Sequence, residues 1–145
     1  MTLPAPEPGL VVRYSYRWLR EHEQGREDGA KDRQCAIIVA VVESDGKTRV
    51  TVLPVTHSAP TDPAVALDIP GATKRRLGLD DARSWIVLDE GNEFLWPGPD
   101  LRPIPGADPD TVAYGFLPPG FFNSLRLRYL ALAKARHARK VPRTE

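Results

Sequence analysis

Hydrophobic and polar residues alternate along the first part of the chain. Between residues 9 and 19, apolar side chains occupy every second position from Val12 to Trp18, separated by arginine or serine. A period of two is typical of a β-strand with one buried face. Residues 35–42 contain no charged or amide side chain and are rich in β-branched residues. This pattern predicts a strand over residues 34–42, buried on both faces at the centre of a sheet.

Loop and turn signals flank this central strand. Residues 20–33 are almost entirely charged or glycine, so we expect an exposed and mobile loop there. After the strand, the dipeptide Asp45-Gly46 predicts a two-residue hairpin of type I′, whose two central positions both need positive φ. A third strand, over residues 48–54, then returns antiparallel to the second.

Weaker patterns continue along the middle of the chain. Residues 64–69 alternate as a short strand, and residues 70–79 predict a single helical turn between two glycines. Residues 84–88 and 93–96 look like two further strands, joined by a tight turn over residues 89–92. We therefore expect these two strands to pair with each other.

The last third of the chain divides into a strap and a helix. Residues 97–120 contain seven prolines, which predicts an irregular connection. A helix is expected over about residues 119–140, because one stripe of apolar residues follows helical spacing. The stripe consists of Phe122, Leu125, Tyr129 and Leu132. Many short strands before one terminal helix predict a mainly β fold with α additions, a small antiparallel barrel formed as one domain from residues 1–145.

Composition and charge exclude several classes of protein. The chain has 145 residues, 41% hydrophobic and 27% charged, which is typical of a globular protein. No apolar run approaches the roughly 20 residues of a membrane span, and the first eight residues lack the pattern of a secretory signal. We therefore expect a cytoplasmic protein without a membrane partner. The single cysteine, Cys35, cannot form an internal disulfide and is expected to be a buried, inert thiol.

The net charge of +1 indicates no particular partner, but its distribution is uneven. Residues 121–145 carry seven basic side chains and one acidic one. Such a segment can approach phosphate, although a solvated helix face is the commoner explanation. No phosphate-binding glycine motif, nucleophile elbow or paired metal ligands occur. The three histidines lie in unrelated contexts, so we expect neither a metal nor a cofactor.

Four segments can be compared, in their order and spacing, with known families. They are Pro8-Gly9-Leu10-Val11, Lys31-Asp32-Arg33-Gln34, Val52-Leu53-Pro54-Val55-Thr56-His57 and Trp85-Ile86-Val87-Leu88-Asp89. Together they resemble the PemK/MazF family of growth inhibitors from toxin-antitoxin systems. The resemblance implies an SH3-like barrel with a terminal helix, in agreement with the pattern above. It further implies a toxin-type endoribonuclease that cleaves single-stranded RNA, a homodimer, and a cognate antitoxin as partner. Trp85, Phe94 and Trp96 offer large apolar surface that a dimer would cover.

The resemblance also implies a set of catalytic residues. Arg33 matches an arginine at the mouth of the family's site, and Thr56 matches the threonine of a proline-x-threonine turn. His57 stands where the family usually has serine or threonine. Asp89 matches the family's aspartate, but Val87 occupies the place of an arginine two residues before it.

The chemistry of RNA cleavage explains why these residue types are needed. Attack by the RNA's own 2′-hydroxyl requires a base, an acid and donors that stabilise the charge on phosphorus, and metal is not obligatory. A guanidinium such as that of Arg33 offers a permanent fork of donors. The imidazole of His57 can accept or give a proton near neutral pH. Four further basic residues are expected to guide the RNA backbone, namely Lys31, Lys74, Arg75 and Arg76.

Structural explanations compete with each of these roles. Thr56 and Asp89 also fit turn positions, His57 can be a structural hydrogen-bonding residue, and the basic residues can be solvated surface. The missing arginine at Val87 favours an alternative function, in which an inactive barrel binds nucleic acid or a peptide. A second alternative is an interaction protein that works through the proline-rich strap.

Overall fold

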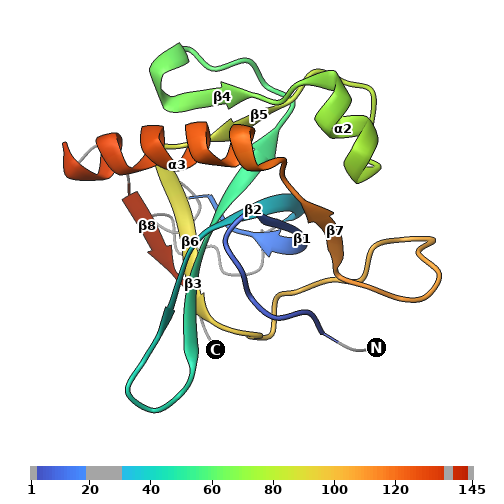
Figure 1. Ribbon diagram of the computed structural model, residues 1–145, viewed down its shortest axis with the longest axis vertical. Coiled ribbons are helices and arrows are strands. Elements are labelled where there is room, and N and C mark those ends of the chain that lie inside the picture. Colours follow the sequence, from blue (N-terminus) through green and yellow to red (C-terminus); the bar gives the residue numbers. More distant parts are fainter. Residues whose placement is uncertain (1–2, 19–30, 136–138, 144–145) are drawn as a thin grey trace.

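The computed structural model describes residues 3–18, 31–135 and 139–143. In this part of the chain, a mainly antiparallel sheet curls into a half-barrel, and two α-helices lie against it (Figure 1). The strands are β1 (Leu10–Tyr16), β2 (Lys31–Val42), β3 (Thr48–Thr56), β4 (Ala66–Asp68), β5 (Trp85–Val87), β6 (Glu90–Leu95), β7 (Ala113–Phe116) and β8 (Arg139–Pro142). The helices are α2 (Gly71–Leu77) and α3 (Pro119–Lys134), with a 3₁₀ turn at Pro63–Val65 before β4.

The strand order is β4-β5-β3-β2-β1-β7. The predicted central strand is confirmed, because β2 pairs with β1 on one side and with β3 on the other. β6 continues the sheet from another section of β3, and β8 pairs with β6 in parallel. The sheet therefore branches at β3, which contacts three neighbours along its length.

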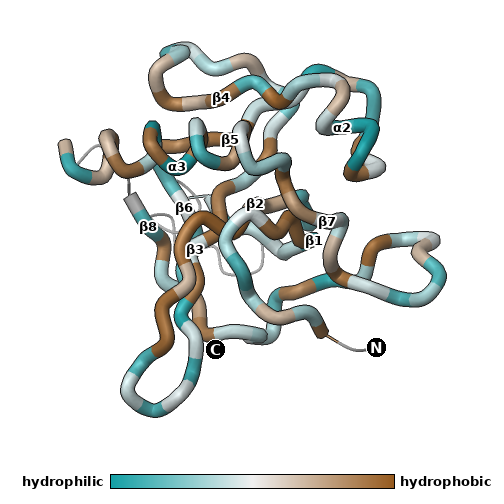
Figure 2. The backbone as a smooth tube through the Cα atoms, in the orientation of Figure 1, coloured by the Kyte–Doolittle hydropathy of each residue, from teal (hydrophilic) through white to brown (hydrophobic). Residues whose placement is uncertain are grey.

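Hydrophobic side chains cover both faces of β1 and β2. One face packs beneath α3, where Leu125 and Tyr129 are buried as the predicted stripe requires. The other face packs inside the half-barrel against Phe94 of β6. Figure 2 shows the hydrophobic segments of the central strands together in the middle of the molecule. The expectation of a solvated face on β1 was wrong, because six of its seven residues are buried.

The loop and hairpin around β2 differ from the sequence-based expectation. Residues 31–33, expected in a mobile loop, begin β2 because they pair with Tyr14, Ser15 and Tyr16 of β1. Residues 19–30 of that expected loop lie outside the described part. At the other end, Glu43 donates its N–H to the carbonyl of Lys47, so three residues connect the pair. Gly46 has φ +84°, as in a three-residue hairpin loop that ends on a left-handed glycine.

The predicted β5–β6 hairpin was wrong. Residues 90–92, expected in a tight turn, belong to β6, and β5 and β6 pair with separate sections of β3. A Cβ on Gly91 would lie 2.9 Å from the carbonyl oxygen of Val52. The glycine therefore permits a close approach of two backbones, which has no sequence pattern distinct from that of a turn.

Two boundaries at the end of the chain also need correction. The proline-rich strap contains β7, which pairs with β1 at the sheet edge. The terminal helix ends at Lys134, six residues before the expected end, and residues 139–142 form β8. The basic tail is thus partly internal, since Arg143 is 9% exposed. The short strand expected within residues 64–69 and the helical turn within residues 70–79 are confirmed as β4 and α2.

Candidate active site

A proline in β3 opens a cleft between two neighbouring strands. β2 and β3 stay paired as far as Cys35 and Pro54. Proline has no N–H with which to continue the ladder, and the next two residues of β3 pair with β5 instead. β2 meanwhile continues along β1 to Lys31. Because β2 and β3 diverge after Pro54, their ends form the two walls of a cleft.

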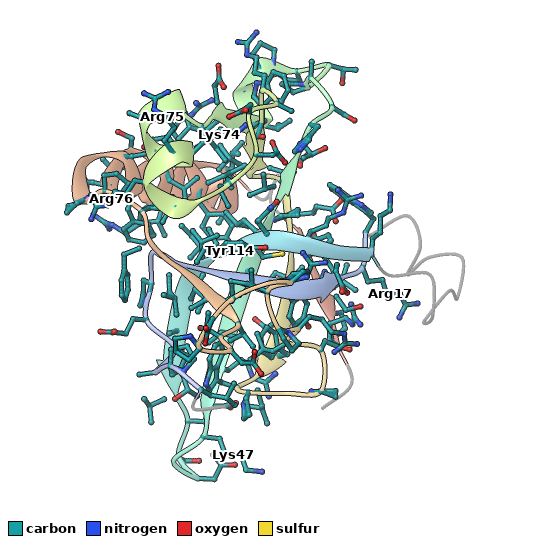
Figure 3. All side chains as sticks on the ribbon, turned by 90° about the vertical axis from the view of Figure 1, so that its right-hand side faces the viewer. Arg17, Lys47, Lys74, Arg75, Arg76 and Tyr114 are labelled. Carbon is teal, nitrogen blue, oxygen red and sulfur yellow. The ribbon has the colours of Figure 1, made fainter. Side chains whose placement is uncertain are left out.

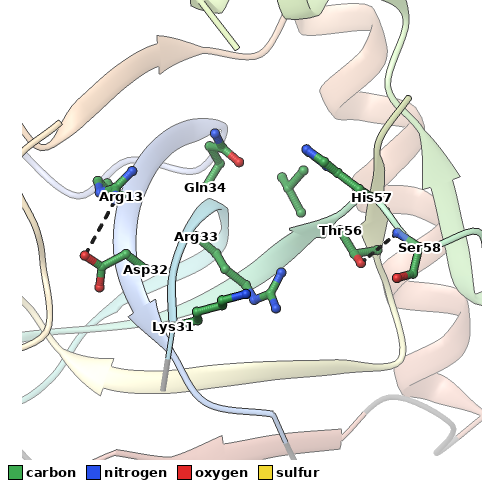
Figure 4. A pocket seen from close by; sticks show the side chains of 9 residues that line it. Arg13, Lys31, Asp32, Arg33, Gln34, Thr56, His57 and Ser58 are labelled. Atoms are coloured by element: carbon green, nitrogen blue, oxygen red, sulfur yellow. Dashed lines mark hydrogen bonds and ion pairs between the residues drawn. The ribbon is translucent and has the colours of Figure 1, made fainter. Parts of the chain in front are cut away.

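The cleft has a volume of about 760 Å³. Figure 4 shows Lys31 and Arg33 on the side formed by β2, and Thr56, His57 and Ser58 on the side formed by the end of β3. Its remaining lining residues are Arg13, Asp32, Gln34 and Val55. Three of the four proposed catalytic residues and one of the four proposed RNA-binding residues therefore meet in one place.

The cleft is electropositive. Among the described residues, three cations line it against a single carboxylate, that of Asp32. Asp32 is itself 3.7 Å from Arg13 and 3.8 Å from Arg102, so its charge is largely balanced. Clefts lined by one sign of charge concentrate ligands of the opposite sign. The lining favours a polyanion such as a nucleic acid backbone.

An aromatic ring orients Arg33. The central carbon of its guanidinium lies 5.1 Å from the ring centroid of Trp18, a cation–π contact. Its Nε is buried and has no hydrogen-bond partner in the described part of the chain. The side chain is thus held by stacking, and no carboxylate among the described residues forms an ion pair with it. The sequence offered no reason to connect Trp18, which follows β1, with Arg33 in β2, because these two strands meet only in the fold.

His57 belongs to a chain of charged groups that the sequence analysis missed. Its Nε2 lies 2.8 Å from Oδ2 of Asp80. Oδ1 of the same carboxylate accepts from the backbone N–H of Ala82 at 3.0 Å and from Nζ of Lys74 at 3.4 Å. The Lys74 side chain is only 6% exposed. Lys74, expected to face RNA, instead points at a carboxylate beside the cleft.

The other predicted site residues lie away from the cleft. Asp89 follows β5 and does not line the cleft. Burial raises the pKa of its carboxyl, a hydrogen bond to its own backbone lowers it, and the nearby Asp62 raises it. Arg75 and Arg76 are exposed on α2, and Figure 3 shows them with Lys74 at one end of the molecule.

Thr56 and Cys35 differ in whether their side chains can take part in a reaction. Ser58 donates its backbone N–H to Oγ1 of Thr56 at 3.1 Å, which leaves the Thr56 hydroxyl proton able to bind an oxygen. Cys35 is fully buried, and burial raises the pKa of its thiol. The expectation of a buried thiol is therefore confirmed, and a protonated, inaccessible sulfur is a poor nucleophile.

A second polar cluster, the Asn92–Arg143 network, is closed to solvent. Asn92 accepts from the backbone N–H of Arg17 at 2.9 Å and donates to its carbonyl at 2.7 Å. Arg143 donates to Asn92 at 3.1 Å, to the carbonyl of Ser15 at 3.0 Å and to Asp100 at 3.1 Å. This network ties the segment after β8 to β1 and β6. Arg128 likewise donates to two backbone carbonyls, so part of the basic C-terminal charge is used within the fold.

The fold and the cleft together define a small antiparallel β protein with an open cationic cleft and a histidine–carboxylate pair. Among the described residues, no group of three or more His, Cys, Asp or Glu side chains is arranged to hold a metal ion. No helix in the same residues is long and apolar enough to cross a membrane. Comparison with protein-family models, curated proteins and solved structures gave no match for this chain.

Proposed function

We propose that the protein is a toxin-type endoribonuclease that cleaves single-stranded RNA at this cleft without a metal ion. The observation that carries the proposal is the meeting of Arg33, Thr56 and His57 in one electropositive cleft. Arg33 lies in β2, whereas Thr56 ends β3 and His57 follows it. The resemblance to PemK/MazF proteins implies a catalytic role for all three, and their convergence from two segments of the chain supports a shared chemical role.

Each residue has a role in the proposed reaction. The 2′-hydroxyl oxygen attacks phosphorus, the bond to the 5′-oxygen breaks, and the products end in a 2′,3′-cyclic phosphate and a 5′-hydroxyl. His57 takes the 2′-proton, and the resulting imidazolium can supply the proton that the leaving oxygen needs. Arg33 donates to the phosphorus oxygens as their negative charge grows. Lys31 binds a neighbouring phosphate, and Thr56 donates its hydroxyl proton to a phosphate oxygen.

Two features favour binding without cleavage as the alternative. Val87 stands where the family's arginine is expected, and Asp89 does not line the cleft. The cleft then depends on His57 alone for proton transfer between 2′- and 5′-oxygens. A protein that lost this activity would keep its cations and bind RNA through the same cleft.

The deciding experiment is incubation of the purified protein with end-labelled single-stranded RNA in EDTA. A DNA of the same sequence is the matched substrate control, because it lacks the 2′-hydroxyl. Cleavage of RNA alone, with cyclic phosphate ends, supports the proposal. Binding of both strands without cleavage supports the alternative, and neither binding nor cleavage rejects both.

The homodimer and the antitoxin belong to the same proposal. Phe94 and Trp85 do not provide the apolar surface expected for a homodimer, because both side chains are buried within the protomer, at 1% and 9% exposure. Exposed apolar side chains are found elsewhere among the described residues, on α3 at Leu127 and Leu130, at 54% and 46%, and at the end of β2 at Val41 and Val42, at 54% and 70%. Light scattering at micromolar concentration tests the dimer directly.

A further inference from the structure

We propose that Asp80 is a positioning residue for His57, which fixes the imidazole as its Nε2–H tautomer so that Nδ1 accepts the proton in the reaction. The inference rests on the proposed function for its role in catalysis. Its structural content, the tautomer, can be tested in the absence of RNA. It makes a residue 23 positions along the chain part of the cleft's machinery.

The geometry places the carboxylate at one nitrogen of the ring only. Asp80 Oδ2 is 2.8 Å from Nε2, a distance typical of a charge-assisted hydrogen bond. A carboxylate has no proton to give, so the neutral ring must donate from Nε2. Nδ1 has no hydrogen-bond partner in the described part of the chain. The free lone pair is therefore on Nδ1, and the exposed ring can present it to a substrate in the cleft.

Lys74 makes the carboxylate a fixed acceptor. Its side chain is 6% exposed, and Asp80 is its ion-pair partner among the described residues. A buried ammonium without a counter-charge is costly, so the ion pair with Lys74 keeps the Asp80 carboxylate close to α2. The N–H of Ala82 binds the same Oδ1. With Oδ1 occupied by two donors, the orientation of the carboxyl group is determined and Oδ2 is directed to His57.

This arrangement gives the amide variant Asp80→Asn a specific consequence. Lys74 and Ala82 both donate and both still require an acceptor, so the amide oxygen must take the place of Oδ1. The amide nitrogen then faces His57 and donates to Nε2, which forces the proton onto Nδ1. The variant keeps the size and shape of the side chain but blocks the proposed base. A similar tautomer error is the reason given for the loss of activity in the amide variant of the Ser-His-Asp triad.

The first measurement is nitrogen-15 NMR of the imidazole of His57, with the ring neutral. The parent protein should show the Nε2–H tautomer, Asp80→Asn the Nδ1–H tautomer, and the matched control Asp81→Asn the parent pattern. Asp81 is the next residue, is exposed, and forms no ion pair with His57 or Lys74 in the described part. An Asp80→Asn protein that retains the Nε2–H tautomer overturns the inference, whatever the protein does to RNA.

The second measurement is the rate of RNA cleavage in single turnover, for Asp80→Asn, for His57→Ala and for the two substitutions combined. Asp80→Asn should lower the rate at least tenfold with RNA affinity unchanged, within the range known for residues that orient a ligand or base. It should have no further effect when His57 is already alanine. Equal losses in both backgrounds would make Asp80 merely structural and reject the inference. If the parent protein cuts no RNA but Asp80→Asn still switches the tautomer of His57, the proposed function is rejected and the positioning by Asp80 is retained.

Discussion

The two polar clusters of the molecule use similar residues for opposite purposes. The Asn92–Arg143 network joins an arginine to a carboxylate in the interior, where the Arg143 side chain is 5% exposed and donates three hydrogen bonds to protein groups. In the cleft, by contrast, Arg33 lines a cavity that is open to solvent, and 46% of the His57 side chain is exposed. Residue type alone does not separate structure from function here. The difference lies in unused hydrogen-bonding capacity that solvent, and therefore a substrate, can reach.

This difference assigns a distinct measurement to each cluster. A group whose partners are all within the protein contributes to the free energy of unfolding when it is removed. A group with free donors contributes to the barrier of a reaction that supplies new acceptors. Variants in the network should change stability and leave the rate of the folded protein unaltered. Variants in the cleft should lower the rate and change stability little.

The largest effect is expected for Arg143→Met. Methionine replaces the aliphatic part of the side chain but lacks the guanidinium, so the partly buried Asp100 loses its hydrogen bond from Arg143 and keeps, among the described residues, the more distant ion pair with Arg102 at 3.9 Å. The free energy of unfolding should therefore fall by about 3 kcal/mol. Urea denaturation measures it, with Arg126→Met, on the exposed face of α3, as the control that should change little. Loss of RNA cleavage in a fully folded Arg143→Met protein would break the division between the two clusters.

An effect of comparable size, but mainly on the rate, is expected for Arg33→Ala. Loss of a donor that acts on the transition state should raise the barrier by about 3 kcal/mol, a reduction of roughly a hundredfold or more. Stability should fall by about 1 kcal/mol at most, the value of the cation–π contact with Trp18. Single-turnover rates and denaturation curves measure the two quantities. Arg75→Ala, outside the cleft, should cut at the parent rate, and an Arg33→Ala protein as fast as the parent would remove the arginine from the mechanism.

His57→Ala should slow cleavage by about a hundredfold, the lower end of the range for general acid–base catalysis. The reduction should exceed that of Asp89→Asn, because His57 lines the cleft and Asp89 does not. Rates of both variants under the same single-turnover conditions decide the order. An inactive Asp89→Asn protein with an active His57→Ala protein would return His57 to a structural role and move the site towards β5.

The smallest effect concerns the stability of Asp89→Asn as a function of pH. Burial raises the pKa of Asp89 in the folded state, with a further rise from Asp62 and an opposing backbone hydrogen bond. A raised pKa in the folded protein means stability that is present in acid and lost as pH rises through that pKa. Asparagine cannot ionise, so the variant should gain stability relative to the parent between acid and about pH 7. Denaturation at both ends of this range measures the difference in free energy of unfolding between variant and parent. A difference that does not change with pH would show that ionisation of Asp89 does not destabilise the folded protein.

The sequence predicted best those elements whose pattern is local. The uninterrupted apolar run of β2 is typical of a strand buried on both faces, and the stripe of α3 is typical of a helix with one buried face. The pattern failed where a distant partner decides the structure. Residues 31–33 are all charged, and residues 90–92 are polar with one glycine. Each segment nevertheless becomes part of a strand, because another strand supplies the hydrogen bonds. Residues 139–142 have no strand signal strong enough to interrupt the expected helix.

The candidate site shows the same limit. Arg33, Thr56 and His57 were selected by a resemblance in sequence, and the fold brings them together. Lys74 was expected to bind RNA and Asp80 was not singled out at all, because a lysine in a basic helix and an aspartate after it are ordinary surface residues in sequence. Only their distances reveal that one carboxylate joins them to His57. A residue that acts through another leaves no local pattern.

The parallel pairing of β8 with β6 also has a consequence for how the protein is made. The ribosome releases β1, β6 and the strap before β8, so Asn92 and Asp100 exist for a time without Arg143 to bind them. At about 5–20 residues per second, synthesis from Asn92 to Arg143 occupies several seconds. During this interval the edge of β6 is an unpaired strand, a template for association with other chains. We expect the nascent chain to be most prone to aggregation in this interval, before β8 is available to pair with β6.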